Sequence, residues 1–362
     1  MRSSASCPGR AGWPAAGAAV LLGAAIFAGC TSGGPSSATA SSTTPSATAT
    51  TLAATGSGSA EAVQQTFVNV LAKVHPQVVE ISTTSDLGSG VVYDANGDIV
   101  TDAHVVGSAT SFTVQLADGQ QPSAGLVGVY APDDLAVIRV TGARDLSPAT
   151  FADSTAVQVG DIVFAVGNPL GLAGSVTEGI VSYNGREVSE GNGITLPSTI
   201  QTSAAINHGN RGGALVALSG RVVGVPALAA LDPQEGGAAA GIGFAIPSNT
   251  VELIAPQLIA AGHVTRSDRA ALDIAAGDAV DPAGRPAGVL IMRRTSPGGS
   301  AAKAGIAPGD VITAINDQKV TSLAFLQAAL SQITPGASVT VTITDQNGAT
   351  RTVTAITSQL AG

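Results

Sequence analysis

The spacing of apolar residues predicts one short helix ahead of a long series of strands. In the stretch EAVQQTFVNVLAKVHP the apolar residues recur with a helical period, so we expect an amphipathic helix that ends before Pro76. Its apolar face is expected to comprise Val63, Phe67, Val70, Leu71 and Val74. Ordered structure is therefore expected to begin near Glu61.

From Gln77 to Pro247 the apolar residues alternate with polar ones or form short runs between turn residues. Asn-Gly at 96–97 and Asp-Gly at 118–119 separate such runs and are typical of β-hairpins. The first batch of runs is QVVEISTT, GSGVVYD, DIVTDAHVV, SFTVQLAD, PSAGLVGVY and DLAVIRV. The second batch is DIVFAVGNP, SVTEGIVSYN, STIQTSAAIN, GALVAL, RVVGVPAL and GIGFAIP. Two batches of about six strands predict a mainly β fold with two six-stranded antiparallel β-barrels.

After Pro247 the pattern changes. The stretch SNTVELIAPQLIAAGHV predicts a helix broken at Pro256, and residues 265–286 are interpreted as a linker and an entry segment. A smaller mixed α/β unit follows, with a last hairpin turned at Asn347-Gly348. The length and element order of this unit are those of a PDZ domain. We therefore expect a barrel domain over residues 61–262 and a PDZ domain over residues 263–362.

Residues 1–30 are interpreted as a lipoprotein-type signal peptide. Arg2 and Arg10 precede the apolar run AAGAAVLLGAAIFAGC. Its ending, IFAGC, resembles a bacterial lipobox, which implies lipidation of Cys30 at the mature N-terminus. An ordinary signal peptide and an uncleaved anchor helix are the alternatives, and all three export the chain. Residues 31–60 are rich in Ser, Thr, Ala, Gly and Pro, which predicts a disordered tether between membrane and folded domains.

Composition narrows the possible ligands. The chain has 362 residues, a net charge of −9 and only 16 Lys and Arg residues without a cluster, which argues against nucleic-acid binding. The cysteines, Cys7 and Cys30, both lie near the N-terminus, so the folded part has no disulfide framework and no cysteine metal site. The histidines lack a metal-ligand spacing such as HExxH, and no Gly-rich phosphate loop is present. We therefore predict neither a metal nor a cofactor.

A histidine and an aspartate at strand ends form a candidate catalytic pair. His104 ends the run DIVTDAH, and Asp134 begins the run DLAVIRV. An imidazole titrates near neutral pH and can act as a general base, and a carboxylate fixes its tautomer and stabilises its protonated form. Followed later in the chain by a nucleophile loop, the two residues are a strong constellation for acyl transfer.

Six motifs follow one another along the chain: GSGVVYDANGDIVTDAHVV, PDDLAVIRV, VGDIVFAVGNPLGLAGSVTEGIVS, IQTSAAINHGNRGGALV, GIGFAIPSN and SPGGSAAKAGIAPGDVITAIN. In this order they resemble the HtrA/Deg family of exported, chymotrypsin-fold serine proteases with C-terminal PDZ domains. The resemblance covers roughly residues 64–357. It implies peptide-bond hydrolysis with His104 as base and Asp134 as its partner. It also implies an oxyanion hole from the backbone N–H groups of Gly209 and Arg211, with Asn210 between them.

The nucleophile position departs from the family, whose loop reads Gly-Asn-Ser-Gly-Gly. Here Arg211 replaces the serine, and a guanidinium has no lone pair for attack. Its cation would also oppose protonation of His104. Three further departures lie nearby: Ser203 where the family usually has Asp, and His208 and Ala214 where it has proline. Four departures in one loop predict little or no activity.

The same loop leaves several questions open. Ser203 belongs to the preceding strand and is not expected to replace the nucleophile, and His208 is interpreted as an exposed loop residue. Arg211 has three possible roles: it pairs with Asp134 or displaces His104, it captures a peptide carboxylate, or it is exposed without a role.

The PDZ unit has a departure of its own. The carboxylate-binding loop of HtrA proteins often reads Leu-Gly-Ile, and here we place it at Leu272-Asp273-Ile274. Asp273 is expected to remove the backbone freedom of glycine and to add an anion beside the bound carboxylate.

Three functions fit these observations. In the first, the chain is an inactive HtrA-like pseudoprotease, a lipoprotein on the outer face of the cell membrane. It would bind polypeptides in a chaperone-like or regulatory role, through its cleft and its PDZ domain. In the second, it is an active serine endopeptidase of protein quality control with an unanticipated nucleophile. In the third, it is a regulatory subunit in mixed oligomers with active relatives, since members of the family are commonly trimers.

Overall fold

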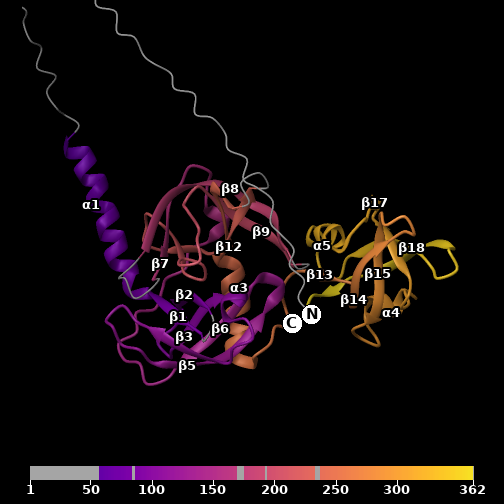
Figure 1. Ribbon diagram of the computed structural model, residues 1–362, viewed down its shortest axis with the longest axis horizontal. Coiled ribbons are helices and arrows are strands. Elements are labelled where there is room, and N and C mark those ends of the chain that lie inside the picture. The colour runs from indigo at the N-terminus through magenta and orange to yellow at the C-terminus, as the bar shows by residue number, and fades with distance from the viewer. Residues whose placement is uncertain (1–56, 84–85, 169–174, 192–193, 233–236, 362) are drawn as a thin grey trace, which may run out of the picture. The chain divides into compact units, whose positions relative to one another are not determined.

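Two barrels and a smaller mixed unit form the described part of the chain (Figure 1). The computed structural model describes residues 57–83, 86–168, 175–191, 194–232 and 237–361. All of them belong to one compact unit of the chain, Thr55–Gly362. The predicted signal peptide, Cys30 and most of the predicted tether lie outside the described residues. Within the described ranges, no helix is both long and apolar enough to cross a membrane.

The first barrel is closed and antiparallel, with the strand order β1-β2-β3-β6-β5-β4. Its strands are β1 Val78–Ser82, β2 Leu87–Val92, β3 Asp98–Asp102, β4 Ser111–Gln115, β5 Ser123–Tyr130 and β6 Leu135–Val140. The pairing of β3 with β6 places Asp102 opposite Leu135. This register matters for the site, because His104 follows β3 and Asp134 immediately precedes β6.

The second barrel is also closed, with the order β10-β11-β12-β9-β8-β7. Its strands are β7 Ile162–Gly167, β8 Ser175–Gly191, β9 Ile194–Thr202, β10 Ala214–Ala217, β11 Val222–Asp232 and β12 Gly237–Pro247. Strand β4 alternates between exposed and buried residues, whereas β1, β2, β3, β6 and β7 are buried over most of their length. The predicted pair of six-stranded barrels is confirmed.

One apolar core joins both barrels to helix α3, Ser248–Ala261. Its large buried members include Tyr130, Leu135, Phe164, Ile246, Ile254 and Leu258. Each such side chain contributes about 1.5–3 kcal/mol on burial. The helix runs through Pro256 without a break, so the predicted break is wrong. Burial of Val251, Ile254 and Leu258 on either side of Pro256 offsets the one backbone hydrogen bond that proline removes.

Helix α1, Ser57–Val74, precedes the barrels and begins earlier than the predicted start near Glu61. Phe67 packs edge-on against Phe164 of β7, with 4.9 Å between the ring centroids. Val70 and Val74 are buried as predicted, but Val63 is 53% exposed and lies outside the contact. The shorter helices of the barrel region are η1 His75–Gln77, α2 Ala103–Val106, η2 Ala131–Asp133 and η3 Ser154–Ala156.

The C-terminal unit is a mixed α/β fold with its own apolar core. Its main sheet has the order β14-β15-β16-β18-β19, with β17 paired to β16, and a separate two-stranded sheet pairs β13 with β20. The elements are β13 Ala270–Ala271, β14 Ile274–Val280, β15 Pro286–Arg294, α4 Ser300–Lys303, β16 Val311–Ile315, β17 Gln318–Lys319, α5 Leu323–Ser331, β18 Ser338–Thr344, β19 Thr350–Ile356 and β20 Ser358–Gln359.

The mainly β fold class is thus confirmed, including the PDZ-like element order. One detail of the C-terminal half is different from the prediction. The segment interpreted as a linker, residues 265–286, contains the strands β13 and β14. Its Ala-rich, Gly-containing sequence has few of the β-branched residues that signal a strand. The exact domain boundaries stay predictions.

Candidate active-site cleft and peptide groove

His104 and Asp134 form a close pair at the end of the first barrel. The Nδ1 atom of His104 lies 2.7 Å from Oδ2 of Asp134, and the His104 backbone N–H donates to Oδ1 at 2.9 Å. Asp134 is only 1% exposed, so the two bonds from His104 hold a carboxylate that water does not reach. The geometry is that of a base whose ring is oriented by a buried carboxylate.

Local backbone structure sets up this pair. His104 lies in the one-turn helix α2, directly after β3. Asp134 has a left-handed φ of 51°, between the turn η2 and strand β6. Aspartate tolerates this conformation better than most residues. The Asp134 carbonyl also accepts the Ala103 N–H at 2.9 Å, so backbone and side chain both tie the two segments together.

A second carboxylate lies on the other side of the His104 ring. Oδ2 of Asp102 is 4.0 Å from Nε2 of His104, and Asp102 is fully buried. One ligand atom from each of Asp102, His104 and Asp134 lies within 4.8 Å of the others, so these are the residues that could hold a metal ion. The 2.7 Å contact accounts for the closeness of His104 and Asp134, and the absence of a metal site stays a prediction.

The loop that carries Arg211 lies against the end of strand β3. The Arg211 carbonyl accepts the Ser89 N–H at 2.9 Å. Gly212 has a φ of +76°, and a Cβ there would collide with the Ser89 carbonyl and the Thr101 hydroxyl. Only glycine fits this close backbone approach. The fold therefore brings the Arg211 loop next to the residues that lead into His104.

Arg211 makes no ion pair with Asp134 among the described residues, because the Asp134 carboxylate is paired with His104. Within the same residues, the Nε atom of Arg211 is buried without a hydrogen-bond partner. The idea that Arg211 pairs with Asp134 is therefore wrong in this conformation. The role of Arg211 as the substituted nucleophile position stays a prediction.

The two amides assigned to the oxyanion hole, Gly209 and Arg211, and the Asn210 amide between them all donate to Asn207. Gly209 N–H bonds to the Asn207 side-chain oxygen at 2.9 Å, and Asn210 and Arg211 N–H both bond to its carbonyl at 3.2 Å. An oxyanion hole needs donors that point at the reacting oxygen. In this conformation the assigned donors are engaged inside the loop, and the assignment stays a prediction.

Two serines lie near the loop. Ser203 was considered as a replacement nucleophile, and Ser89 was not singled out from the sequence. The Ser203 hydroxyl oxygen accepts the Ile180 N–H at 3.0 Å, which holds Ser203 against strand β8. The Ser89 hydroxyl donates to the Gly209 carbonyl at 2.7 Å and accepts the Asn168 N–H at 2.9 Å. Ser89 thus links the two barrels at the loop. Its place in a Gly-Ser-Gly strand gives no local signal for this role.

The other two departures from the family motif, His208 and Ala214, differ in burial. His208 is exposed, in agreement with its interpretation as a surface loop residue. Ala214 is fully buried at the start of strand β10. Asn207 was also missed, because its function as an internal acceptor depends on the folded turn and not on its position in the motif.

A groove of about 700 Å³ runs between strand β14 and helix α5, and Pro132 and Thr195 of the barrel region line part of it. Apolar side chains of Leu272, Ile274, Leu323, Leu326 and Leu330 line it. The predicted loop Leu272-Asp273-Ile274 lies at this groove. A largely apolar trough along a strand edge is suited to an added peptide strand. The assignment of the loop to carboxylate binding stays a prediction.

Asp273 does not behave as the sequence suggested. It adopts a left-handed φ of 56°, so the backbone keeps the conformation that glycine would favour. Its Oδ2 accepts the Ser300 N–H at 2.7 Å, which places the charge at the start of helix α4. The carboxylate therefore satisfies a backbone donor of the fold.

Comparisons with known proteins agree with this architecture. The trypsin-like peptidase domain family matches residues 88–225, and the PDZ domain family matches residues 293–345. The solved HtrA-type protease AlgW with tripeptide is 32% identical with a TM-score of 0.56, covering 81% of this chain and 97% of that chain. The chain belongs to the HtrA/DegP family.

Two curated relatives extend the HtrA/DegP comparison. Periplasmic serine endoprotease DegP of Escherichia coli (strain K12) is 43% identical over 262 residues, which cover 70% of this chain and 53% of that protein. Serine protease PepD of Mycobacterium tuberculosis (strain ATCC 25618 / H37Rv) is 38% identical over 307 residues, covering 78% of this chain and 64% of that protein. This HtrA/DegP chain thus spans about half the length of DegP.

Proposed function

We propose that this HtrA/DegP chain is an exported peptide-binding protein whose protease-fold cleft does not hydrolyse peptide bonds. The observation that carries the proposal is Arg211, which stands where the family motif has its serine. A guanidinium cannot form an acyl-enzyme, and removal of the nucleophile costs a serine protease about 10⁶ in turnover. Engagement of the Gly209, Asn210 and Arg211 amides by Asn207 further supports a silent cleft.

Polypeptides are the proposed ligands. The apolar groove beside β14 offers a strand edge for a C-terminal segment. The surface around His104, whose side chain is 32% exposed, is the second proposed contact surface. The chain would hold such clients in a chaperone-like or regulatory role. We further propose that a lipid on Cys30 anchors it at the outer face of the cell membrane, with residues 31–60 as tether.

The test compares the full chain with its Arg211→Ser variant on unfolded casein, with peptide release as the measurement. We expect the parent to be inert. If the single change produces cleavage, the His104–Asp134 pair is competent and only the nucleophile is missing. Arg211→Ala is the matched control, since it removes the guanidinium without supplying a hydroxyl. If Arg211→Ser is as inert as the parent and Arg211→Ala, the site lacks more than its nucleophile.

An active endopeptidase is the second candidate, and the 2.7 Å contact between His104 and Asp134 favours it. The curated relatives are also named as serine proteases. Cleavage of casein by the parent, abolished by His104→Ala, would replace the first proposal with this one. Covalent labelling of the parent by a serine-directed phosphonate would then locate the nucleophile.

A further inference from the structure

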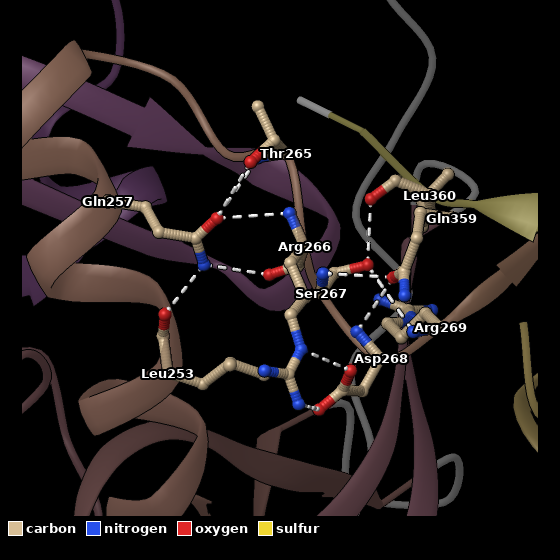
Figure 2. A network of polar contacts seen from close by, with 9 residues as sticks. All are labelled: Leu253, Gln257, Thr265, Arg266, Ser267, Asp268, Arg269, Gln359 and Leu360. Carbon is tan, nitrogen blue, oxygen red and sulfur yellow. Dashed lines mark hydrogen bonds and ion pairs between the residues drawn. The ribbon is translucent and has the colours of Figure 1, made fainter.

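A dense set of hydrogen bonds holds the linker that follows helix α3 (Figure 2). The side-chain amide of Gln257 donates to the carbonyls of Leu253 and Arg266, both at 2.7 Å. Its oxygen accepts the backbone N–H groups of Thr265 and Arg266 at 3.1 and 3.0 Å. Because α3 belongs to the core shared by both barrels, this one amide fixes the linker to a rigid element.

The C-terminal segment clasps the other end of the linker, as Figure 2 shows. The side-chain oxygen of Gln359 accepts the N–H groups of Ser267 and Asp268 at 3.2 and 3.0 Å. The Leu360 N–H donates to the Arg269 carbonyl at 2.8 Å, and the Ser267 hydroxyl donates to the Leu360 carbonyl at 2.7 Å. We call this set of contacts the Gln359–Leu360 clasp. It fixes the backbone on both sides of the Arg269 side chain.

From this fixed backbone, the Arg269 guanidinium reaches the turn before Asp134. Its Nη1 donates to the Pro132 carbonyl at 2.6 Å and to Oδ1 of Asp133 at 2.7 Å, and its Nη2 donates to the Thr195 carbonyl at 3.1 Å. The Arg269 and Asp133 side chains are 11% and 4% exposed. Burial raises the pKa of Asp133, and the charge and hydrogen bond of Arg269 act against that rise.

This contact bears directly on the His104 pair, because Asp133 is covalently joined to Asp134. We infer that Arg269 is the positioning residue for the Asp134 turn, and that the Gln359–Leu360 clasp holds Arg269 in place. A three-point fork from a planar guanidinium fixes orientation as well as distance. The inference concerns the geometry of His104 and Asp134, so it holds whether or not the cleft hydrolyses peptides.

The test follows the His104 ring by NMR in the full chain, without peptide. We expect a downfield Nδ1–H signal from the hydrogen bond to Asp134, assigned by its loss in His104→Gln. Arg269→Met should shift or broaden this signal. Arg269→Lys should restore it in part, since an ammonium can still pair with Asp133 but cannot reproduce the fork.

The matched control is Arg266→Met, in the same linker. Arg266 pairs with Asp268 at 2.9 Å, but their side chains are 67% and 50% exposed. Its loss should leave the His104 signal unchanged. Gln359→Ala should move the signal in the same direction as Arg269→Met but by less. An unchanged His104 signal in Gln359→Ala would contradict the inference that the Gln359–Leu360 clasp holds Arg269 in place.

A double variant separates positioning from simple charge compensation. Removing one partner of a buried ion pair leaves an uncompensated charge, which can itself unfold the site. Arg269→Met combined with Asp133→Asn avoids that charge, so the double variant should recover thermal stability over Arg269→Met alone. Its His104 signal should stay displaced, since the bonds to Pro132 and Thr195 are still lost. A wild-type signal in the folded double variant would mean that Arg269 only neutralises Asp133, and the inference would be wrong.

Discussion

Two regions of the chain carry a charged residue at a position where the family resemblance leads us to expect a small one, and the fold accommodates the two charges differently. In the PDZ unit, the Asp273 carboxylate accepts the Ser300 N–H at 2.7 Å. In the second barrel, the Nε atom of Arg211 is buried without a hydrogen-bond partner among the described residues. A charge that satisfies its own fold is a structural replacement. A buried donor without a hydrogen-bond partner is costly, so the fold does not accommodate Arg211 in the way it accommodates Asp273.

If the Arg211 side chain has no partner, the backbone of the loop around it must hold the loop in place. Gly212→Ala tests this most severely, because a Cβ would collide with Ser89 and Thr101 at a φ of +76°. We expect a loss of about 4 kcal/mol in the free energy of unfolding, from strain plus collision. Urea unfolding followed by circular dichroism measures it.

Gly241→Ala is the matched control for Gly212→Ala. Gly241 has a similar φ of +72°, but a Cβ there meets nothing within 4 Å. This control should cost only the strain, about 1 kcal/mol. Equal losses in the two variants would show that the Arg211 loop is not tightly packed, and the contrast with Asp273 would lose its basis.

Substitutions of Asp273 are expected to have the next largest effect on the free energy of unfolding. Asp273→Ala removes the bond to Ser300 and forces alanine into a left-handed conformation, so we expect a loss of about 2 kcal/mol. Asp273→Gly removes the same bond but suits the conformation, so its loss should be about 1 kcal/mol or less. Thermal unfolding of the two variants measures the difference. If glycine is as harmful as alanine, the carboxylate contributes more than this one hydrogen bond.

The barrel strands and their turns could be predicted from the sequence, because they depend on residues that are close together in the chain. The alternating or apolar runs, with the Asn-Gly turn at 96–97 and the Asp-Gly turn at 118–119, predicted the barrel strands, because these signals act within a few residues. His104 and Asp134 could be paired in advance from their order before the nucleophile loop and from the family resemblance, since a carboxylate orients and stabilises a histidine base. Their 2.7 Å contact is set by the register of β3 on β6.

The parts that could not be predicted depend on distant partners. The Asp273 carboxylate bonds to Ser300, and Arg269 bonds to Asp133 in the first barrel. No local propensity encodes either contact. The uninterrupted helix through Pro256 has the same explanation, since burial on the shared core outweighs the local cost of proline.

Arg211→Met is expected to change the free energy of unfolding least, and it tests the contrast between Arg211 and Asp273 most directly. Methionine keeps much of the length and apolar contact of arginine but has no donor to leave unsatisfied. We expect it to raise the free energy of unfolding by about 1 kcal/mol, because a buried donor without a partner is penalised by that order. Thermal unfolding measures it, with Arg211→Lys as the control that retains the cation. A destabilised methionine variant would mean that Arg211 has a partner in solution. Arg211 would then resemble Asp273 after all, a charge absorbed by its own fold.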